Sequence, residues 1–347
     1  MRVLVAMSGG VDSSVAAALV VEAGHEVEGV TLKLWGGDSD TGCCAVSDTE
    51  DARRAARRLG IPHHVFNYAE EFEDHVVGPY AAAHAEGRTP NPCIECNRHL
   101  KFDALTRRAE VLGFDAVATG HHARIVTGPG GRRLARGADV RKDQSYVLHM
   151  LSERDLERLL FPVGEHTKDE VRRLAAELDL GTADKPDSQD VCFVTRASGR
   201  RSFLADRIDL HPAVVVDGAG NELGRTDAVE LVTIGQRRGL TLAGGPGRRY
   251  VTEVDVPRRR VTVGDHQDLT VGRTPLEGLV WAGEPLPDGA EVTVQTSAHG
   301  TPRPATVDGS SVRWREPAPR VAAGQAVVLY ERWGADEVVA GGATAAR

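Results

Sequence analysis

A glycine-rich loop near the N-terminus constrains the fold of this chain more than any other feature of its sequence. The loop, Ser8-Gly9-Gly10-Val11-Asp12-Ser13-Ser14, follows a short apolar run, Val3 to Met7, and leads into an Ala/Val-rich run, Ser13 to Val21. The first run predicts a strand and the second a buried helix. Glycines allow positive φ angles and close backbone approach, and the free N–H groups of a helix N-terminus attract anions. The sequence therefore predicts a strand–loop–helix unit that binds phosphate.

Two common nucleotide-binding patterns do not fit this loop. A Walker A loop needs a Lys after its second glycine, and a dinucleotide-binding loop needs the spacing GxGxxG. Neither pattern occurs between residues 8 and 14.

Strand-like and helix-like runs alternate along the first half of the chain. The further strand-like runs are Val27 to Trp35, Ile61 to Tyr68 and Asp115 to Thr119. The helix-like runs are Ser47 to Leu59, Glu70 to Glu86, Lys101 to Leu112 and Thr167 to about Leu178. Two of these helices begin with a capping box, Ser47-Asp48-Thr49-Glu50 and Thr167-Lys168-Asp169-Glu170. The alternation predicts an α/β fold with an open parallel sheet and right-handed crossovers.

The pattern changes after about residue 205. Short strand and turn segments rich in Gly come first, and from about residue 273 only strand-like segments remain. We therefore expect three parts: an α/β domain over residues 1–204, a small central α+β domain over 205–272 and a C-terminal β-barrel over 273–347.

The composition is that of a globular protein, with 41% hydrophobic and 27% charged residues. No apolar run approaches the roughly 20 residues that span a bilayer, and the N-terminus lacks the apolar core of a signal peptide. We therefore expect a cytoplasmic protein with no membrane partner. The net charge of −8 argues mildly against a polyanionic partner, but residues 195–260 hold 12 arginines against 8 acidic residues. Local patches of this kind decide binding to nucleic acid.

Five cysteines, an odd number in a large chain, exclude a disulfide scaffold. Cys96 follows a string with two prolines, Arg88-Thr89-Pro90-Asn91-Pro92-Cys93-Ile94-Glu95, which predicts a rigid extended loop that runs into a helix. A helix N-terminus with Arg98 and Lys101 nearby favours the thiolate of Cys96. Cys192 lies in a polar loop later in the chain. Two cysteines so placed suit sulfur transfer, in which one thiol carries a persulfide and the other attacks it.

Other uses of the cysteines stay open. Cys93 and Cys96 have the spacing of half a zinc site, but Cys43 and Cys44 are adjacent and cannot supply the second half. We interpret Cys43 and Cys44 as structural or incidental. An iron–sulfur cluster held by Cys93, Cys96 and Cys192 is an alternative that would also serve thiolation.

The loop resembles the phosphate loop of the ATP-pyrophosphatase (PP-loop) superfamily, whose members cleave ATP between its α- and β-phosphates. With the two cysteine strings, the chain resembles the tRNA-specific 2-thiouridylase family from residue 1 to about residue 265, and weakly beyond. The further matching strings are Ala118-Thr119-Gly120-His121, Lys142-Asp143-Gln144-Ser145-Tyr146, Phe161-Pro162-Val163-Gly164, Thr233-Ile234-Gly235-Gln236-Arg237-Arg238-Gly239-Leu240 and Ala323-Gly324-Gln325.

This resemblance implies an ATP-pyrophosphatase (adenine-nucleotide alpha-hydrolase-like) domain at residues 1–204 and a barrel that contacts tRNA. It implies an ATP-dependent tRNA sulfurtransferase that adenylates O2 of the wobble uridine, anticodon position 34, and replaces this oxygen with persulfide sulfur. The product is 2-thiouridine. The implied cofactors are ATP and Mg²⁺. The implied partners are the tRNA anticodon loop and a persulfide donor protein, such as a cysteine desulfurase or a sulfur-relay carrier.

The resemblance also implies roles for individual residues. Cys96 resembles the family's nucleophile and Cys192 its persulfide cysteine, and the two would end as a disulfide. The positions that resemble the ATP site are Ala6, Met7, Ser8, Gly9, Gly10, Val11, Asp12, Ser13, Leu32 and Gly120. Those that resemble tRNA-contacting positions are Asn91, Pro92 and Cys93 at the target uridine, and His121, Lys142, Asp143, Gln144 and Gln325 elsewhere. No protein ligand to a metal ion is predicted.

Some features depart from the family, and other functions remain to be tested. Gln295-Thr296-Ser297-Ala298 lacks the Arg-Tyr pair of some relatives, which leaves the tRNA contact of the barrel open. One alternative is another PP-loop ligase or amidotransferase such as a guanosine monophosphate synthetase, although no glutaminase string is visible. Another is a non-catalytic RNA-binding or redox-sensing protein, which ATP–pyrophosphate exchange would distinguish.

Overall fold

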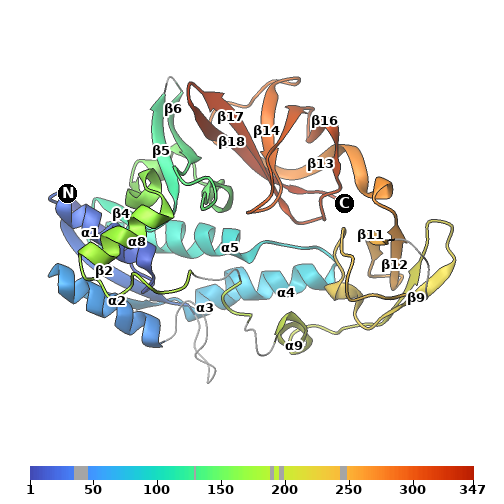
Figure 1. The fold of residues 1–347 in the computed structure, drawn as a ribbon, viewed down its shortest axis with the longest axis horizontal. Coiled ribbons are helices and arrows are strands. Elements are labelled where there is room, and N and C mark those ends of the chain that lie inside the picture. Colours follow the sequence, from blue (N-terminus) through green and yellow to red (C-terminus); the bar gives the residue numbers. More distant parts are fainter. Residues whose placement is uncertain (35–45, 129, 188–190, 195–198, 243–247) are drawn as a thin grey trace. The chain divides into compact units, whose positions relative to one another are not determined.

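The computed structural model describes residues 1–34, 46–128, 130–187, 191–194, 199–242 and 248–347 (Figure 1). These residues form two compact units, each made of several chain segments. Unit 1 comprises Met1–Val76, Pro92–Thr195 and Arg332–Val339. Unit 2 comprises Val77–Asn91, Arg196–Glu331 and Ala340–Arg347. Cys43 and Cys44 lie outside the described residues.

Unit 1 is built on a five-stranded parallel sheet, which confirms the predicted α/β fold. The strand order is β3-β2-β1-β4-β7. The strands are β1 (Arg2–Ala6), β2 (Glu26–Lys33), β3 (His63–Asn67), β4 (Ala116–Thr119) and β7 (Leu159–Leu160). Val3, Leu4 and Val5 of the central strand β1 are completely buried. This strand is therefore covered on both faces, as is usual in a parallel sheet.

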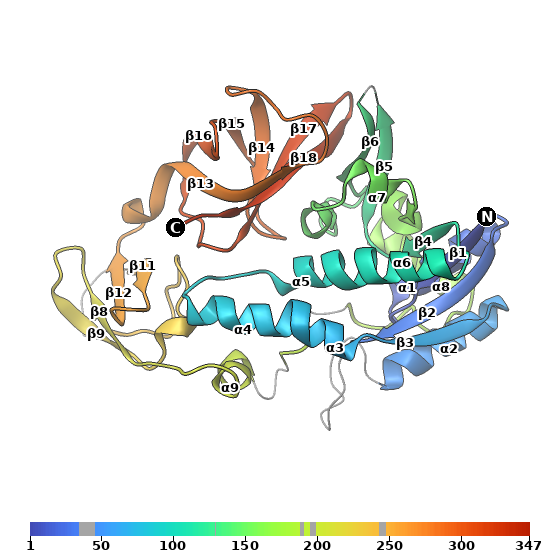
Figure 2. The same ribbon diagram turned by 180° about the vertical axis from the view of Figure 1, so that it is seen from behind.

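Helices cover both faces of this sheet (Figure 1, Figure 2). α1 (Val11–Glu22) and α2 (Val46–Leu59) pack on one face, and the helical run over residues 92–111 lies on the other. α8 (Lys168–Glu177) packs against α1 through Val171 and Ala175. Because α1 lies between the sheet and α8, its Ala and Val side chains are buried on nearly every side.

One of the two predicted capping boxes is present. Oγ1 of Thr167 accepts the N–H of Glu170 at 3.3 Å, and the Glu170 carboxylate accepts the N–H of Thr167 at 2.7 Å. The other predicted helix start is wrong, because α2 already begins at Val46 and Ser47 lies inside its first turn. The neighbouring Asp48 carboxylate binds Lys185 across unit 1.

Two helical runs contain a π-helical stretch. The run predicted over residues 70–86 consists of α3 (Ala69–Phe72), a π-helical stretch (Glu73–Val77) and α4 (Gly78–Ala85). The second run consists of α5 (Pro92–Glu95), a π-helical stretch (Cys96–Ala104) and α6 (Leu105–Val111). This run begins at Pro92 rather than at the predicted Lys101, because the fixed φ angle of proline suits the first position of a helix. Cys93 therefore lies on the helix and not in the predicted loop, whereas Cys96 lies near the N-terminus of the helical run, as predicted.

Unit 2 contains the small mixed sheet that the central α+β prediction anticipates. Its strand order is β10-β9-β8-β12-β11, with β8 and β12 parallel. The strands are β8 (Ala213–Val216), β9 (Glu222–Thr226), β10 (Thr241–Leu242), β11 (Tyr250–Asp255) and β12 (Arg260–Gly264). Val215, Val251 and Val261 in its core are completely buried. The remaining short helices of the chain are α7 (Glu153–Leu156), α9 (Gly199–Ala205) and 3-10 turns at Ser145–Leu148, Pro162–Glu165, Val229–Leu231 and Gln267–Leu269.

The C-terminal strands form a closed six-stranded antiparallel barrel, which confirms the predicted barrel. The strands are β13 (Thr270–Trp281), β14 (Glu291–Gln295), β15 (Arg303–Val307), β16 (Ser311–Pro319), β17 (Ala326–Trp333) and β18 (Asp336–Ala345). Their order is β13-β16-β15-β14-β17-β18, and pairing of β13 with β18 closes the barrel. Inside it, Nε1 of the buried Trp314 donates to Oγ1 of Thr274 at 2.9 Å. Closure gives every barrel strand two neighbours and so removes exposed edges.

A hairpin of unit 1 extends the end of β18. β5 (Ala123–Gly128) and β6 (Gly131–Arg136) pair with each other, and Ala135 of β6 pairs with Val338 of β18. Arg124 and Arg136 reinforce this pairing through the carboxylates of Asp336 and Glu337, at 2.6 and 2.7 Å.

A search of the described residues for a helix long and apolar enough to cross a bilayer finds none.

His84 of α4 is a buried titratable group in unit 2. Its side chain is 2% exposed, and Nδ1 lies 3.2 Å from the carbonyl oxygen of Glu230. The ring packs edge-on against Tyr80, with 4.6 Å between the ring centroids. Burial lowers the pKa of His84 to about 4, because the charged imidazolium would lose its hydration.

Replacing His84 by Gln is expected to flatten the acid side of the stability profile. Between pH 6.5 and about 4 the unfolded chain binds a proton at His84 that the folded protein does not, so stability falls as the pH falls. The unfolding temperature should thus drop more steeply for the wild type than for His84→Gln over this range. The exposed His266→Gln is the matched control. Parallel profiles for wild type and His84→Gln would contradict the prediction.

Candidate active site

The glycine-rich loop joins β1 to α1 and leaves the helix N-terminus without a side-chain cap. Gly9 has φ +75°, and a Cβ atom there would lie 2.1 Å from the carbonyl oxygen of Asp48. Only glycine therefore fits this position. Gly10 is the N-cap of α1 and has no side chain to bond to the first turn. The first N–H groups of α1 thus have no capping partner, which is the arrangement that binds phosphate.

Two serines of the loop bind its backbone. Oγ of Ser13 accepts the N–H of Ser8 at 3.2 Å and donates to the carbonyl of Gly10 at 3.1 Å. Oγ of Ser14 also donates to the Gly10 carbonyl, at 2.9 Å. Both serines are buried, so their hydroxyls fix the shape of the loop.

Two predicted ATP-site residues lie outside the loop. Gly120 follows β4, and a Cβ atom on it would lie 2.5 Å from the backbone nitrogen of Ser13. Gly120 is therefore in close backbone contact with the first turn of α1. Leu32 lies on β2, next to β1, and is 8% exposed.

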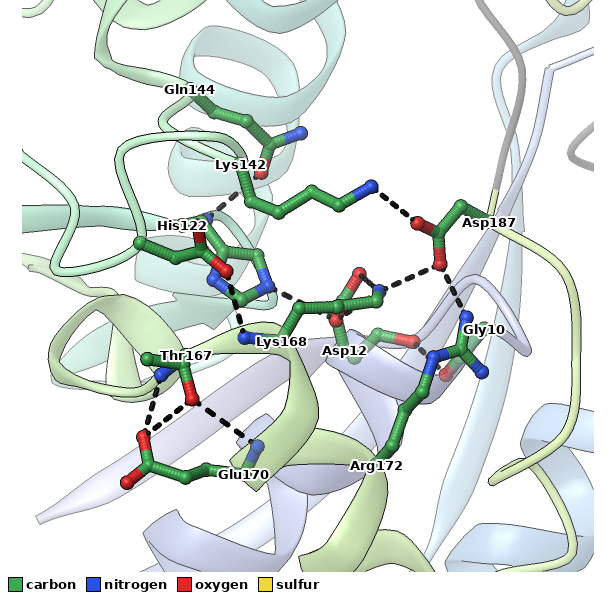
Figure 3. Close-up of polar contacts among 12 residues, drawn as sticks. Gly10, Asp12, His122, Lys142, Gln144, Thr167, Lys168, Glu170, Arg172 and Asp187 are labelled. Carbon is green, nitrogen blue, oxygen red and sulfur yellow. Dashed lines mark hydrogen bonds and ion pairs between the residues drawn. The ribbon is translucent and has the colours of Figure 1, made fainter.

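A chain of charged side chains begins at Asp12, in the first turn of α1 (Figure 3). Nζ of Lys168 lies 2.7 Å from both carboxylate oxygens of Asp12, and Nε2 of His122 lies 3.1 Å from one of them. Burial alone would raise the pKa of Asp12, but the hydrogen bonds from His122 and Lys168 and the charge of Lys168 hold it below its usual 3.8. Asp12 is therefore ionised at neutral pH. Its contribution to the stability of the fold is lost only as the pH falls below 3.8.

The chain continues to Asp187. Its carboxylate lies 2.9 Å from Nζ of Lys168, 2.7 Å from Nζ of Lys142 and 2.7 Å from Nη2 of Arg172 (Figure 3). Burial would raise the pKa of Asp187, but the hydrogen bonds and charges of Lys142 and Lys168 lower it far below the usual value. Asp187 is thus an ionised carboxylate held by three cations.

A second cluster fastens the same chain segment to the loop. Nζ of Lys185 donates to the carbonyl of Gly9 at 3.0 Å and to Asp48 and Asp51 at 2.5 Å each. Burial would lower the pKa of Lys185, but its hydrogen bonds and charge interactions with Asp48 and Asp51 raise it.

The three cysteines that the structure describes are half-exposed thiols. Cys93 lies in the first turn of α5 and Cys96 begins the π-helical stretch. Cys192 follows Val191, whose φ of +55° is strained for a β-branched residue. The N–H of Val194 donates to the carbonyl of Val191 at 3.1 Å, and the buried Phe193 packs edge-on against Phe72 at 5.7 Å. Cys192 therefore lies in a strained turn that Phe193 anchors by packing against Phe72.

Four residues of unit 1 that were predicted to contact tRNA, His121, Lys142, Asp143 and Gln144, differ in burial and in the protein groups that they bind. His121 is buried against Phe102 and Phe161, and burial lowers its pKa well below the usual value. The Asp143 carboxylate, 4% exposed, binds Arg136 at 2.9 Å. Oε1 of Gln144 accepts the N–H of His122 at 2.9 Å. Asp143 and Gln144 therefore order the backbone around them, and their contact with tRNA remains a prediction. Lys142 is exposed, and its ammonium group forms an ion pair with Asp187.

In unit 2, Gln325 holds the segment that precedes Asn91. Nε2 of Gln325 donates to the carbonyl of Thr89 at 2.8 Å, and the N–H of Thr89 donates to the carbonyl of Ala323 at 2.8 Å. Both backbone groups of Thr89 are thus bound by the barrel segment 323–325.

Within the described ranges, no group of three or more His, Cys, Asp and Glu side chains is placed to hold a metal ion.

Sequence reasoning missed Lys168, Lys185 and His122. In the sequence, Lys168 stands out only as part of a capping box. In the structure it is the cation that binds both Asp12 and Asp187. A usable signal was the rarity of lysine, because only five of the 42 basic residues are lysines. Three of the five, Lys142, Lys168 and Lys185, bind carboxylates around the loop.

Two family models match the chain, and both carry tRNA in their description. The tRNA methyl transferase HUP domain matches residues 1–196, and the tRNA methyl transferase PRC-barrel domain matches residues 201–265.

Curated relatives match over nearly the whole length of both chains. The chain is 49% identical to a tRNA-specific 2-thiouridylase of Acidothermus cellulolyticus, with 100% of this chain and 98% of the relative aligned. It is 46% identical to a protein of the same description from Thermobifida fusca, with 100% and 96% aligned. Among solved structures, a 4-thiouridine synthetase–RNA complex with bound ATP is similar with a TM-score of 0.38 and 21% identity, over 55% of this chain and 44% of that chain.

Replacing Gly120 by Ala is expected to weaken nucleotide binding. The new Cβ atom would meet backbone atoms of Asp12 and Ser13, so the N-terminus of α1 must shift. We expect the dissociation constant for ATP, measured by calorimetry, to rise at least roughly tenfold, which is about 1.4 kcal/mol. Gly218→Ala is the matched control, since a Cβ atom there has nothing within 4 Å. A folded Gly120→Ala protein with wild-type affinity would refute this role of Gly120.

Proposed function

This chain belongs to the tRNA-specific 2-thiouridylase family, and we propose from that premise that it makes 2-thiouridine at the wobble position of tRNA. Like the relatives that span its length, it is an ATP-dependent tRNA uridine thiolase. The observation that carries the proposal is the uncapped N-terminus of α1 beside Lys168. Methyl transfer, which the family-model descriptions mention, needs neither such a phosphate site nor paired cysteines.

In the first step, O2 of the uridine attacks the α-phosphate of ATP and pyrophosphate leaves. The N–H groups of α1 and the helix dipole stabilise the negative charge of the phosphates. Gly9 and Gly120 allow close approach of the backbone. The product is an O-adenylated uridine, whose C2 now carries AMP as a good leaving group.

In the second step, a persulfide on Cys192 supplies sulfur. Its terminal sulfur attacks C2 and AMP leaves, which forms a disulfide between Cys192 and the base. The thiolate of Cys96 then attacks the Cys192 sulfur and releases 2-thiouridine. Alternatively, Cys96 first releases the terminal sulfur as sulfide, which attacks C2. Both routes end in a Cys96–Cys192 disulfide that a thiol reductant reopens.

The target uridine lies in a single-stranded loop, so little energy is needed to unstack it. We propose that Asn91, Pro92 and Cys93 contact this uridine and that Gln325 positions them through Thr89. Lys142 then contacts a tRNA phosphate, while His121, Asp143 and Gln144 support the tRNA-facing surface. The arginine pairs between residues 195 and 260 supply further phosphate contacts.

Mg²⁺ would arrive with ATP. Mg²⁺ usually keeps several water ligands and binds through substrate phosphates and one or two carboxylates. The bound ion would offset charge on the phosphates.

We further propose that residues 1–204 perform catalysis, that 205–272 form a small central domain, and that the barrel at 273–347 contacts tRNA. The persulfide donor is a separate protein, such as a cysteine desulfurase or a sulfur-relay carrier. The site of action is the cytoplasm.

Changing either Cys96 or Cys192 to Ser is expected to abolish thiolation and leave adenylation intact. Purified variants would be given ATP, Mg²⁺, unmodified tRNA and a persulfide donor, and 2-thiouridine would be measured by mass spectrometry after digestion. ATP–pyrophosphate exchange dependent on tRNA should persist in both variants. Cys43→Ser, outside both motifs, is the control. Normal thiolation by Cys96→Ser or Cys192→Ser would overturn the two-cysteine scheme.

A further inference from the structure

The imidazole of His122 binds the Asp12 carboxylate in the first turn of α1 (Figure 3). Nε2 lies 3.1 Å from Oδ1 of Asp12, and the buried Nδ1 has no hydrogen-bond partner among the described residues. Because Asp12 is ionised, Nε2 carries the hydrogen of this bond. Lys168 also binds Asp12, but it shares its ammonium group with Asp187. Within the described part of the chain, the imidazole of His122 therefore serves Asp12 alone.

Gln144 fixes the backbone of His122 through two hydrogen bonds. Oε1 of Gln144 accepts the N–H of His122 at 2.9 Å, and the N–H of Gln144 donates to the carbonyl of His122, also at 2.9 Å. Gly137 packs closely on the same carbonyl, since a Cβ atom there would lie 2.6 Å from its oxygen. The side chain of His122 is only 3% exposed. Gln144 therefore determines where the imidazole meets Asp12.

Asp12 would compete with a phosphate group if its carboxylate were not held. Asp12 is the second residue of α1, and the N-cap of this helix makes no side-chain hydrogen bond to the first turn. The free N–H groups and the helix dipole attract carboxylates as well as phosphates. In the structure the Asp12 carboxylate binds Lys168 and His122 instead. A triphosphate at this N-terminus would also attract the ammonium group of Lys168, which leaves His122 to hold the carboxylate.

We propose that His122 is a positioning residue that holds the Asp12 carboxylate away from the N-terminus of α1, and that Gln144 acts on the ATP site through His122. This inference rests on the proposed function. The N–H groups of α1 thereby stay free for the triphosphate. Gln144, which sequence resemblance marks as a tRNA contact, thus contributes to ATP affinity even when no tRNA is bound.

Two substitutions of His122 separate hydrogen bonding from packing. His122→Phe keeps a ring and removes the donor, whereas His122→Gln places an amide N–H near the position of Nε2. Calorimetry with a non-hydrolysable ATP analogue and Mg²⁺, without tRNA, would give the dissociation constant. Pyrophosphate exchange with tRNA would give kcat and the KM for ATP.

We expect His122→Phe to raise the dissociation constant and the KM roughly five- to tenfold at unchanged kcat, as for the loss of one hydrogen bond to an ionised group. His122→Gln should stay within about twofold of the wild type, because it restores the donor. Near-normal affinity of His122→Phe with weaker binding by His122→Gln would mean that the ring only fills space, and would overturn the proposal.

Gln144 provides a second test, which also decides if His122→Phe does not fold. Gln144→Ala removes the acceptor of the His122 N–H, whereas Gln144→Glu keeps an oxygen at this position. Without tRNA, Gln144→Ala should bind the analogue several-fold more weakly than Gln144→Glu and the wild type. Gln267→Ala, at an exposed glutamine of unit 2, is the matched control. Wild-type affinity of Gln144→Ala would overturn the role of Gln144 in the ATP site.

A double substitution tests whether His122 acts through Asp12. In an Asp12→Asn protein, His122→Phe should change the affinity for the analogue by less than about twofold, because the carboxylate that it holds is gone. A further five- to tenfold loss, about the effect of one such hydrogen bond, would show that His122 acts on another group and would overturn the proposal.

The proposed function and this inference fail in different ways. Absence of analogue binding by the wild type would overturn the proposed function. Binding by the wild type that neither His122→Phe nor Gln144→Ala weakens would overturn only the positioning role of His122.

Discussion

The buried ammonium group of Lys168 is the constraint on which unit 1 depends. Burial of a charge costs several kcal/mol unless oppositely charged, hydrogen-bonding partners surround it. Asp12 on α1 and Asp187 on the segment before Cys192 supply these partners. One cation therefore ties two helices and a non-helical segment together, at the point where the glycine loop leaves the sheet. The cation beside the phosphate-binding loop thus also joins the elements that form the site.

Much of the fold of unit 1 follows from local sequence. Strand-like and helix-like runs alternate, each ended by a turn residue, and a parallel sheet with crossovers is the only common architecture that uses such an order. The β5–β6 hairpin was not foreseen, because its strands gain their stability by pairing with β18 far along the chain. The π-helical stretches were also missed, since a widened turn leaves little trace in apolar periodicity. The barrel was foreseen in outline but not in strand order, which depends on non-local pairing.

The candidate site likewise has parts that local sequence predicts and parts that form only when distant segments meet. The glycine loop was predictable because its strand, turn and helix are contiguous in sequence. The charge network was not, since Asp12, His122, Lys168 and Asp187 meet only after folding. Asp143 and Gln144 illustrate the opposite difficulty. Sequence resemblance marks them as substrate contacts, whereas their side chains here bind Arg136 and the backbone of His122.

The strained turn at Val191 affects how strongly its conformation is populated. A β-branched residue held at φ +55° stores strain of about 1–3 kcal/mol. Because about 1.4 kcal/mol is a tenfold change in an equilibrium constant, this strain lowers the population of the resting turn relative to any arrangement that relaxes it. The burial of Phe193 against Phe72 opposes that bias. The turn at Val191 is therefore kept in place by the packing of Phe193 against Phe72 and not by the preference of its own backbone.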